Sequence, residues 1–270
     1  MGGAAGLTRA DAQRFYEDFS VAVGLRDWLL PNARHEQLKI LVREVLRRRD
    51  LRILDVGCGA GVMSAYLTRF GDVTGIDFSE PAIDVARRLA PDVSFIAGSL
   101  DVVPRDSQFD VITLFDVLEH IPAVERPQFL GDLSCRLVDG GILLVSTPHP
   151  AYTRHRRRTN DDSLQIIDEE VPVDRVAAEA EVHGLRLVEF RAYDVFRGSP
   201  EYQFLMFGLG LAPGGTASLR SSALHRRMRL LDIPGVRRLR RFGHAARLAG
   251  RGGRSAARWM LTGRAPSPRS

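Results

Sequence analysis

Apolar and polar residues alternate along much of the chain in two patterns. Short segments in which apolar residues gather, as expected for strands, stand at 52–56, 73–77, 93–97, 109–115, 141–146, 185–193 and 202–208. Between them, apolar residues recur every three or four positions, which predicts helices near 60–70, 80–89, 124–138 and 172–183. Such alternation is typical of parallel strands joined by crossover helices. The pattern therefore predicts an α/β fold with a mostly parallel sheet.

The chain in front of the first strand follows a helical pattern. Thr8 can cap a first helix, and a second helix is expected over 32–49, where Leu38 and Leu41 share one face. We therefore expect residues 1–50 to form a helical unit that precedes the sheet.

Residues 150–170, PAYTRHRRRTNDDSLQIIDEE, interrupt the alternation. They are polar, and the segment is too long for a simple connection, so we expect an irregular surface insertion close to a functional site. RHRRR (154–158) is expected to be a solvated cluster, with a grip on an anionic acceptor as the alternative. NDD (160–162) has no matched acidic partner earlier in the chain, so no metal site is expected.

The chain changes character after the sequence APGG at 212–215. From Thr216 onward it holds fourteen arginines and one acid, Asp232, although the net charge of the whole chain is only +5. We interpret this extension as a solvated tail, with contact to an anionic membrane surface as the alternative. Nucleic acid is not expected as a partner, because the rest of the chain is acidic. The predicted units are therefore 1–50, 51–212 and the arginine-rich extension 213–270.

The composition fits a globular protein of the cytoplasm. Hydrophobic residues make up 44% of the chain, which is enough for a core of ordinary size. No apolar run approaches the roughly 20 residues of a membrane span. The N-terminus lacks the apolar core of a secretory signal, and two cysteines, Cys58 and Cys135, suit a reducing compartment better than a disulfide framework.

The stretch LRILDVGCGAGV (51–62) carries the clearest chemistry. Its three alternate glycines allow a sharp turn after a strand and bring backbone N–H groups close to a ligand at a helix N-terminus. The dinucleotide-binding fingerprint requires its third glycine three positions after the second, where this chain has Val62. Asp55 would also repel a pyrophosphate. The turn therefore favours a ligand with a cationic end.

S-adenosylmethionine is such a ligand, because it carries an ammonium and a sulfonium beside a carboxylate that backbone donors can hold. Asp77 ends the next strand, twenty residues after Gly57, where an acid can accept hydrogen bonds from ribose hydroxyls. Nucleotide-binding proteins that use NAD place an acid similarly, so Asp77 alone does not discriminate. The glycine spacing and Asp55 do.

Five motifs stand in order over residues 51–149: ILDVGCGAG, VTGIDFSEPAIDVAR, FIAGSLDVVPRDSQFDVI, LFDVLEHIP and LVDGGILLVSTPHP. Together they make this region resemble the class I S-adenosylmethionine-dependent methyltransferases of the small-molecule, ubiquinone-biosynthesis-like type. The resemblance implies a Rossmann-like, seven-stranded sheet whose last strand is antiparallel. It also implies a helical lid in residues 1–50 and S-adenosyl-L-methionine at the carboxyl ends of the first strands.

The resemblance assigns cofactor contacts position by position. Asp77 would accept hydrogen bonds from the ribose, Phe78 would lie against the adenine face, and the backbone N–H of Leu100 would donate to the adenine. Ser99 stands where the family often has an acid, and its hydroxyl can still accept one hydrogen bond. The full implied set is Asp55, Gly57, Cys58, Gly59, Gly61, Asp77, Phe78, Ser99, Leu100, Phe115 and Tyr16, with Arg34 and His35 as further lid residues.

Three residues are candidates for acceptor chemistry. Asp116 resembles the family position between cofactor and acceptor, and His120 and His149 can each act as a general base. The alternative for His120 is a structural pair with Glu119. Two polar residues of the insertion, Tyr152 and His155, are expected to be acceptor contacts or plain surface.

The expected function is transfer of a methyl group to oxygen, nitrogen or activated carbon of a small organic acceptor, in specialised metabolism. Two alternatives stay open. In one, the acceptor is a quinone or lipid head group at a membrane. In the other, the chain binds the cofactor as a regulator and transfers no methyl group.

Overall fold

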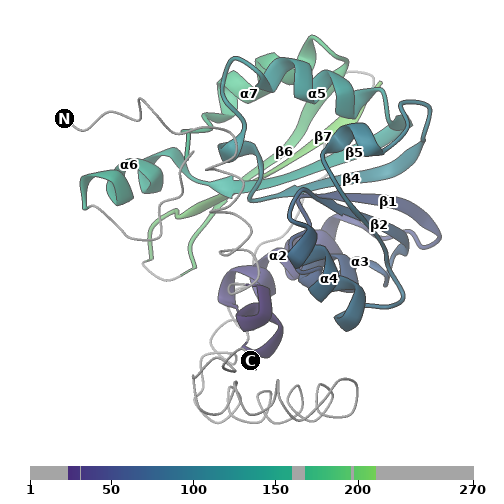
Figure 1. Cartoon of the computed structure of the whole chain (residues 1–270). Coiled ribbons are helices and arrows are strands. Elements are labelled where there is room, and N and C mark those ends of the chain that lie inside the picture. The colour runs from purple at the N-terminus through teal and green to yellow at the C-terminus, as the bar shows by residue number, and fades with distance from the viewer. Residues whose placement is uncertain (1–23, 31, 160–167, 196–197, 211–270) are drawn as a thin grey trace, which may run out of the picture.

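The computed structural model describes residues 24–30, 32–159, 168–195 and 198–210 (Figure 1). Its centre is a seven-stranded sheet in the order β3-β2-β1-β4-β5-β7-β6. β7 is antiparallel to both neighbours, and the other pairs are parallel, which confirms the predicted α/β fold. The strands are β1 (Leu51–Val56), β2 (Gly71–Asp77), β3 (Ser94–Ala97), β4 (Phe109–Phe115), β5 (Leu137–Pro148), β6 (Leu185–Tyr193) and β7 (Tyr202–Leu209).

Helices cover both faces of the sheet, so that each face has its own core. α2, α3 and α4 lie on one face, and α5 and α7 on the other (Figure 1). Leu38 of α2 and Ile83 of α4 belong to the first buried cluster, and Leu130 of α5 and Val176 of α7 to the second. The helices are α2 (Ala33–Val45), α3 (Val62–Leu67), α4 (Glu80–Leu89), α5 (Arg126–Ser134), α6 (Pro150–Arg158) and α7 (Val173–Glu181), with short 3-10 turns at Leu100–Val102 and Leu118–His120.

The sheet register brings three loops to one edge. Val56 pairs with Ile76 of β2 and with Leu114 of β4, so β1, β2 and β4 end side by side. The strand order runs outward in opposite directions from β1 and β4, which opens a crevice beyond their carboxyl ends. The glycine turn therefore lies beside the residues that follow Asp77 and Phe115.

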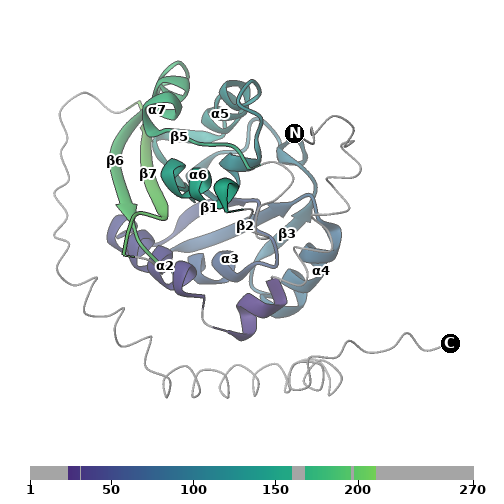
Figure 2. The same ribbon diagram turned by 90° about the vertical axis from the view of Figure 1, so that its left-hand side faces the viewer.

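Part of the insertion is regular, so the prediction of an irregular segment at 150–170 was wrong for its first half. α6 starts with Pro150 at its first position, and the ring of His149 accepts a hydrogen bond from the Ala151 N–H as N-cap. Figure 2 shows α6 in front of the strand ends. RHRRR is not simply solvated, because Arg156 is only 7% exposed and pairs with Asp168. Residues 160–167, which include NDD, lie outside the described residues.

The described part of the N-terminal unit packs over the glycine turn. Residues 24–29 are helical, and Trp28 Nε1 donates a 2.6 Å hydrogen bond to the carbonyl of Ala60. Gly24 lies so close that an added Cβ would stand 2.3 Å from Ala60 Cβ. The helix expected after Thr8 and the extension 213–270 lie outside the described residues.

Candidate functional site

A cavity of about 610 Å³ lies at the carboxyl ends of β1, β2 and β4. One side is formed by the glycine turn and the loops after β2 and β3. The other side is formed by residues after β4 together with α2, α6 and the start of β7. The cavity therefore has two ends with different linings, a strand-loop end and a helix end.

The glycine turn adopts a backbone that favours glycine at each alternate position. Gly57, Gly59 and Gly61 have φ of 70°, 51° and 79°. An added Cβ would come 2.4 Å from Val117 Cγ2 at Gly57, but would meet nothing within 4 Å at Gly59. The turn is therefore packed on one side and open at Gly59, which lines the cavity.

Cys58 lines the cavity within this turn. Burial raises the pKa of its thiol well above the ordinary value. Its Sγ would lie 3.0 Å from a Cβ added at Gly75 of the neighbouring strand. A tightly packed, protonated thiol is a small structural side chain and no nucleophile.

Asp77 joins the end of β2 to the glycine turn. Its Oδ2 accepts a 2.8 Å hydrogen bond from the Gly59 N–H, and its Oδ1 accepts one of 2.9 Å from the Ser79 N–H. Burial raises the pKa of Asp77, and these two donors act in the opposite direction. Each oxygen keeps a further lone pair, and the residue lines the cavity. Phe78 beside it is 44% exposed, so its ring is available to a flat ligand.

Asp55 is held by the protein itself. It is 2% exposed, and its two oxygens accept hydrogen bonds of 2.5 Å from Ser64 Oγ and 2.6 Å from Thr113 Oγ1. Burial raises the pKa of Asp55 to about 6, against the effect of both hydroxyls. Asp55 thus ties β1 to α3 and β4, and its contact with a cationic ligand stays a prediction.

The raised pKa of Asp55 predicts a specific pH dependence. Because the pKa of Asp55 is higher in the folded than in the unfolded protein, its contribution to the free energy of unfolding falls as the pH rises from about 4 through about 6. Asp55→Asn, which does not titrate, should match wild type near pH 4 and exceed it by up to about 3 kcal/mol at pH 7.5. Urea unfolding of both proteins across this range measures the difference. A difference that does not change with pH would contradict the assignment.

The next loop contributes two of the expected residues. Ser99 and Leu100 both line the cavity after β3. The Ser99 hydroxyl donates to the carboxylate of Asp101, two residues further on. A carboxylate is therefore present close to the position where the family often has an acid.

Asp116 lies between the two ends of the cavity in a strained backbone. Its φ is 58°, which is uncommon for a residue other than glycine. Its Oδ2 forms an ion pair with Arg34 of α2, and its Oδ1 is buried with no hydrogen-bond partner among the described residues. Burial raises the pKa of Asp116, while Arg34 and His120 lower it. A ligand in the cavity would find an unused acceptor atom here.

His120 and Glu119 follow on the same loop. His120 lines the cavity, and its Nε2 lies 4.0 Å from Glu119 Oε1. Glu119 is buried and accepts a 2.9 Å hydrogen bond from Thr147 Oγ1. Burial, and next the nearby Asp116 charge, raise the pKa of Glu119 well above its usual range. Both residues therefore line the cavity, and Glu119 is in addition tied to β5 through Thr147.

The structure does not bring all expected residues together. Phe115 lines the cavity, but His149 does not, because its ring caps α6. Tyr16 lies outside the described residues. Within the described ranges, no group of three or more His, Cys, Asp or Glu side chains is placed to hold a metal ion.

Sequence reasoning missed two residues of the helix end, Tyr202 and Asp168. Tyr202 starts β7, and Asp168 precedes α7, so both lie far along the chain from Asp116. Tyr202 reaches the cavity because β7 inserts beside β5 in the antiparallel direction, which brings its start to the carboxyl end of β5. Asp168 reaches it beside Arg156 of α6, with which it forms an ion pair. The sequence motifs carry no signal for either residue.

Comparison with known proteins gives matches of two kinds. Residues 53–141 match the family model described as a methyltransferase domain. The ubiquinone biosynthesis O-methyltransferase of Coxiella burnetii is 30% identical over 135 residues, which cover 45% of this chain and 57% of that protein. The chain thus spans little more than half the length of this relative.

Two solved structures share the fold. The N-methyltransferase NodS from Bradyrhizobium japonicum, in complex with S-adenosyl-L-homocysteine, has a TM-score of 0.59 at 18% identity, covering 74% of this chain and 99% of that one. The cyclase SpnF has a TM-score of 0.56 at 16% identity, covering 74% and 97%. At these identities the likeness establishes the arrangement of helices and strands, and the chemistry has to come from the site.

Proposed function

We propose that this chain is a methyltransferase of the class I fold that transfers the methyl group of S-adenosyl-L-methionine to a small organic acceptor. One arrangement carries this proposal. Asp77 and Gly59 hold each other by a 2.8 Å hydrogen bond at the point where the glycine turn is open to the cavity. The turn is thereby fixed before any ligand binds.

The residues of the strand-loop end fit the cofactor. The space at Gly59 leaves room for close approach, so that turn N–H groups can hold the methionine carboxylate. Asp77 can accept hydrogen bonds from the ribose hydroxyls through its remaining lone pairs. The exposed ring of Phe78 suits one face of adenine, with Ser99 and Leu100 at its edge.

The bound cofactor would supply an electrophilic methyl group on a sulfonium. The acceptor atom forms its bond to that methyl as the carbon–sulfur bond breaks, and the acceptor's proton leaves to a base or to water. This chain's part is to align the acceptor and to exclude water, because the reaction is an in-line displacement in which charge disappears. His120 and Asp116 line the cavity between its two ends, where the acceptor's proton would be released.

We propose oxygen as the acceptor atom, with nitrogen and activated carbon as alternatives. The support is the likeness to ubiquinone biosynthesis O-methyltransferases over 135 residues. The fold shared with the cyclase SpnF supports one rival, in which the domain does not transfer methyl groups. Turnover of any acceptor, measured as production of S-adenosylhomocysteine, would exclude this rival.

Calorimetric titration with S-adenosylmethionine, S-adenosylhomocysteine and NAD tests the cofactor. We expect micromolar binding of both sulfur ligands and none of NAD. Binding of NAD alone would overturn the proposal, and binding of no ligand would point to a fold that has lost the cofactor.

A second candidate function places the acceptor at a membrane. Within the described ranges, no helix is both long and apolar enough to cross a bilayer. The extension after Thr216 holds fourteen arginines, among which Val236, Leu239 and Phe242 recur at helical spacing. If the tail is solvated, neither the full chain nor residues 1–215 should float with anionic vesicles in a flotation assay. Flotation of the full chain alone would favour a quinone or lipid head group as the acceptor.

A further inference from the structure

Six side chains form one continuous row along the helix end of the cavity. The guanidinium of Arg34 lies 5.4 Å from the ring centre of Tyr202, and that of Arg156 lies 5.7 Å from the ring centre of Tyr152. The two rings are 6.2 Å apart. Each arginine also pairs with an acid. We call this row the tyrosine wall; in order it contains Asp116, Arg34, Tyr202, Tyr152, Arg156 and Asp168, all of which line the cavity.

The two ends of the tyrosine wall come from different parts of the fold. Arg34 and Asp116 stand close to the proposed site of methyl transfer, next to His120. Arg156 and Asp168 come from the insertion, and both are less than one-tenth exposed. Arg156 Nη1 lies 3.5 Å from Asp168 Oδ2. The insertion therefore places a second, buried pair of opposite charges in the cavity, at the other end of this series of contacts from Asp116.

Other contacts also attach α6, among them a hydrogen bond that Arg157 donates to the carbonyl of Asp168. Arg154 and Arg157 of α6 both pair with Glu170 at the surface. The Glu169 carboxylate lies 3.4 Å from Arg126, and the Glu169 N–H donates a hydrogen bond to the carbonyl of Glu119. Burying an ion pair costs desolvation energy, and apolar side chains of similar size often stabilise such a place better. The pair that faces the cavity therefore calls for an explanation other than anchoring.

The chemistry of the pair selects one kind of ligand group. Arg156 can only donate hydrogen bonds, and ionised Asp168 can only accept them. A hydroxyl or a primary amide satisfies both at once. A carboxylate would be repelled by Asp168, and an ammonium would be repelled by Arg156. The two tyrosine rings between the ends suit a flat, unsaturated body.

We propose that Arg156 and Asp168 determine acceptor specificity by binding an uncharged donor–acceptor group, such as a hydroxyl, at the far end of a planar acceptor. This inference rests on the proposed methyl transfer for the orientation of the acceptor. It replaces the alternative in which RHRRR grips an anionic acceptor, because the arginine that reaches the cavity pairs with a carboxylate.

Four phenols of two lengths test the inference in binding experiments. Hydroquinone and 4,4′-dihydroxybiphenyl carry a hydroxyl at the far end, and 4-hydroxybenzoate and 4′-hydroxybiphenyl-4-carboxylate carry a carboxylate. Each is titrated calorimetrically with the full chain, with and without S-adenosylhomocysteine. In wild type, one hydroxyl probe should bind at least about tenfold more tightly than its carboxylate counterpart. Equal affinities, or no binding of either hydroxyl probe, would overturn the inference.

Asp168→Asn gives the sharpest variant, because it removes the negative charge and keeps the shape. The preference should then turn toward the carboxylate probe, since the charge of Asp168 no longer repels a carboxylate beside Arg156. Arg154→Met is the matched control: Arg154 lies on the same helix, pairs with Glu170 at the surface and does not line the cavity, so the preference should stay as in wild type. An Asp168→Asn protein that keeps the wild-type preference would contradict the proposal.

A second variant guards against misfolding of the first. Arg156→Met with Asp168→Leu replaces the buried pair by apolar groups and should keep or raise the thermal midpoint. It should bind 4-phenylphenol as tightly as 4,4′-dihydroxybiphenyl, with unchanged affinity for S-adenosylhomocysteine. If the wild-type protein did not bind S-adenosylhomocysteine, that result would count against the proposed function. The preference between probes, measured without S-adenosylhomocysteine, tests the tyrosine wall alone.

Discussion

Replacing Asp77 with alanine is expected to weaken the binding of S-adenosylmethionine roughly 100-fold. The loss has two physical sources. The carboxylate can no longer accept hydrogen bonds from the ribose hydroxyls, and hydrogen bonds to a charged group each contribute about 1.5–3 kcal/mol. The Gly59 and Ser79 N–H groups also lose the acceptor that fixes the turn. Calorimetric titration of the variant and of wild type measures the ratio directly.

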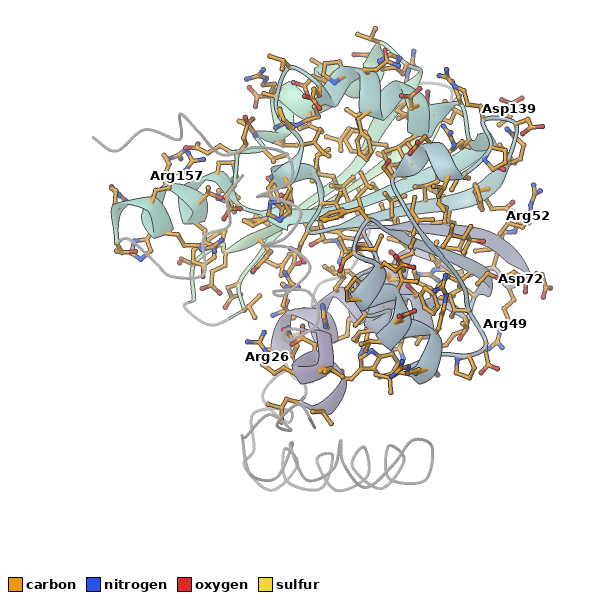
Figure 3. The ribbon with its side chains drawn as sticks, viewed as in Figure 1. Arg26, Arg49, Arg52, Asp72, Asp139 and Arg157 are labelled. Carbon is orange, nitrogen blue, oxygen red and sulfur yellow. The ribbon has the colours of Figure 1, made fainter. Side chains whose placement is uncertain are left out.

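Asp72→Ala is the matched control for this prediction. Asp72 stands near the start of the same strand, is exposed, and lies on the opposite side of the molecule from Arg157 (Figure 3). Its removal should leave cofactor affinity within about twofold of wild type, because it touches neither the turn nor the cavity. If Asp77→Ala bound the cofactor as tightly as Asp72→Ala, the ribose would have to lie elsewhere.

Gly61→Ala is expected to lower the free energy of unfolding by about 3 kcal/mol. Gly61 has a φ of 79°, which alanine adopts with strain, and its added Cβ would lie 2.6 Å from Phe95 Cζ and 3.0 Å from Ala86 Cβ. The variant therefore combines backbone strain with a clash in the core between α3, α4 and β3. Urea unfolding followed by circular dichroism measures the loss.

Two other glycines separate strain from clash. Gly140 has a similar φ of 75° and an added Cβ would meet nothing within 4 Å, so Gly140→Ala should cost only about 1 kcal/mol. Gly59→Ala should likewise cost little stability, yet its methyl group enters the cavity and should weaken cofactor binding. A Gly61→Ala protein as stable as Gly140→Ala would mean that the turn does not pack as described.

The strands were predictable because apolar residues gather in each of them between turn residues. β4 and β6 have the boundaries that the hydrophobic pattern gives, and α4 begins and ends as expected. β5 is longer than 141–146, since Leu137 pairs with Phe109 across an irregularity that no apolar run records. Pairing partners, not local pattern, set the ends of such a strand.

The strand-loop end of the site was also predictable, because a glycine turn and the acid of the next strand are local features. The helix end of the site could not be predicted in the same way. α6 was missed although Pro150 and His149 are a usual helix start, since the many charged residues were interpreted as a solvated loop. His149 caps α6 and is not among the residues that line the cavity, so its role as a general base stays a prediction.

The helices before β1 contact both ends of the cavity. Trp28 holds the carbonyl of Ala60 in the glycine turn, and Arg34 holds Asp116 and covers Tyr202. Any ligand that steadies these helices lowers the ordering cost for the other ligand, so cofactor and acceptor should bind with positive heterotropic cooperativity. By linkage, the factor by which the acceptor tightens cofactor binding equals the factor by which the cofactor tightens acceptor binding.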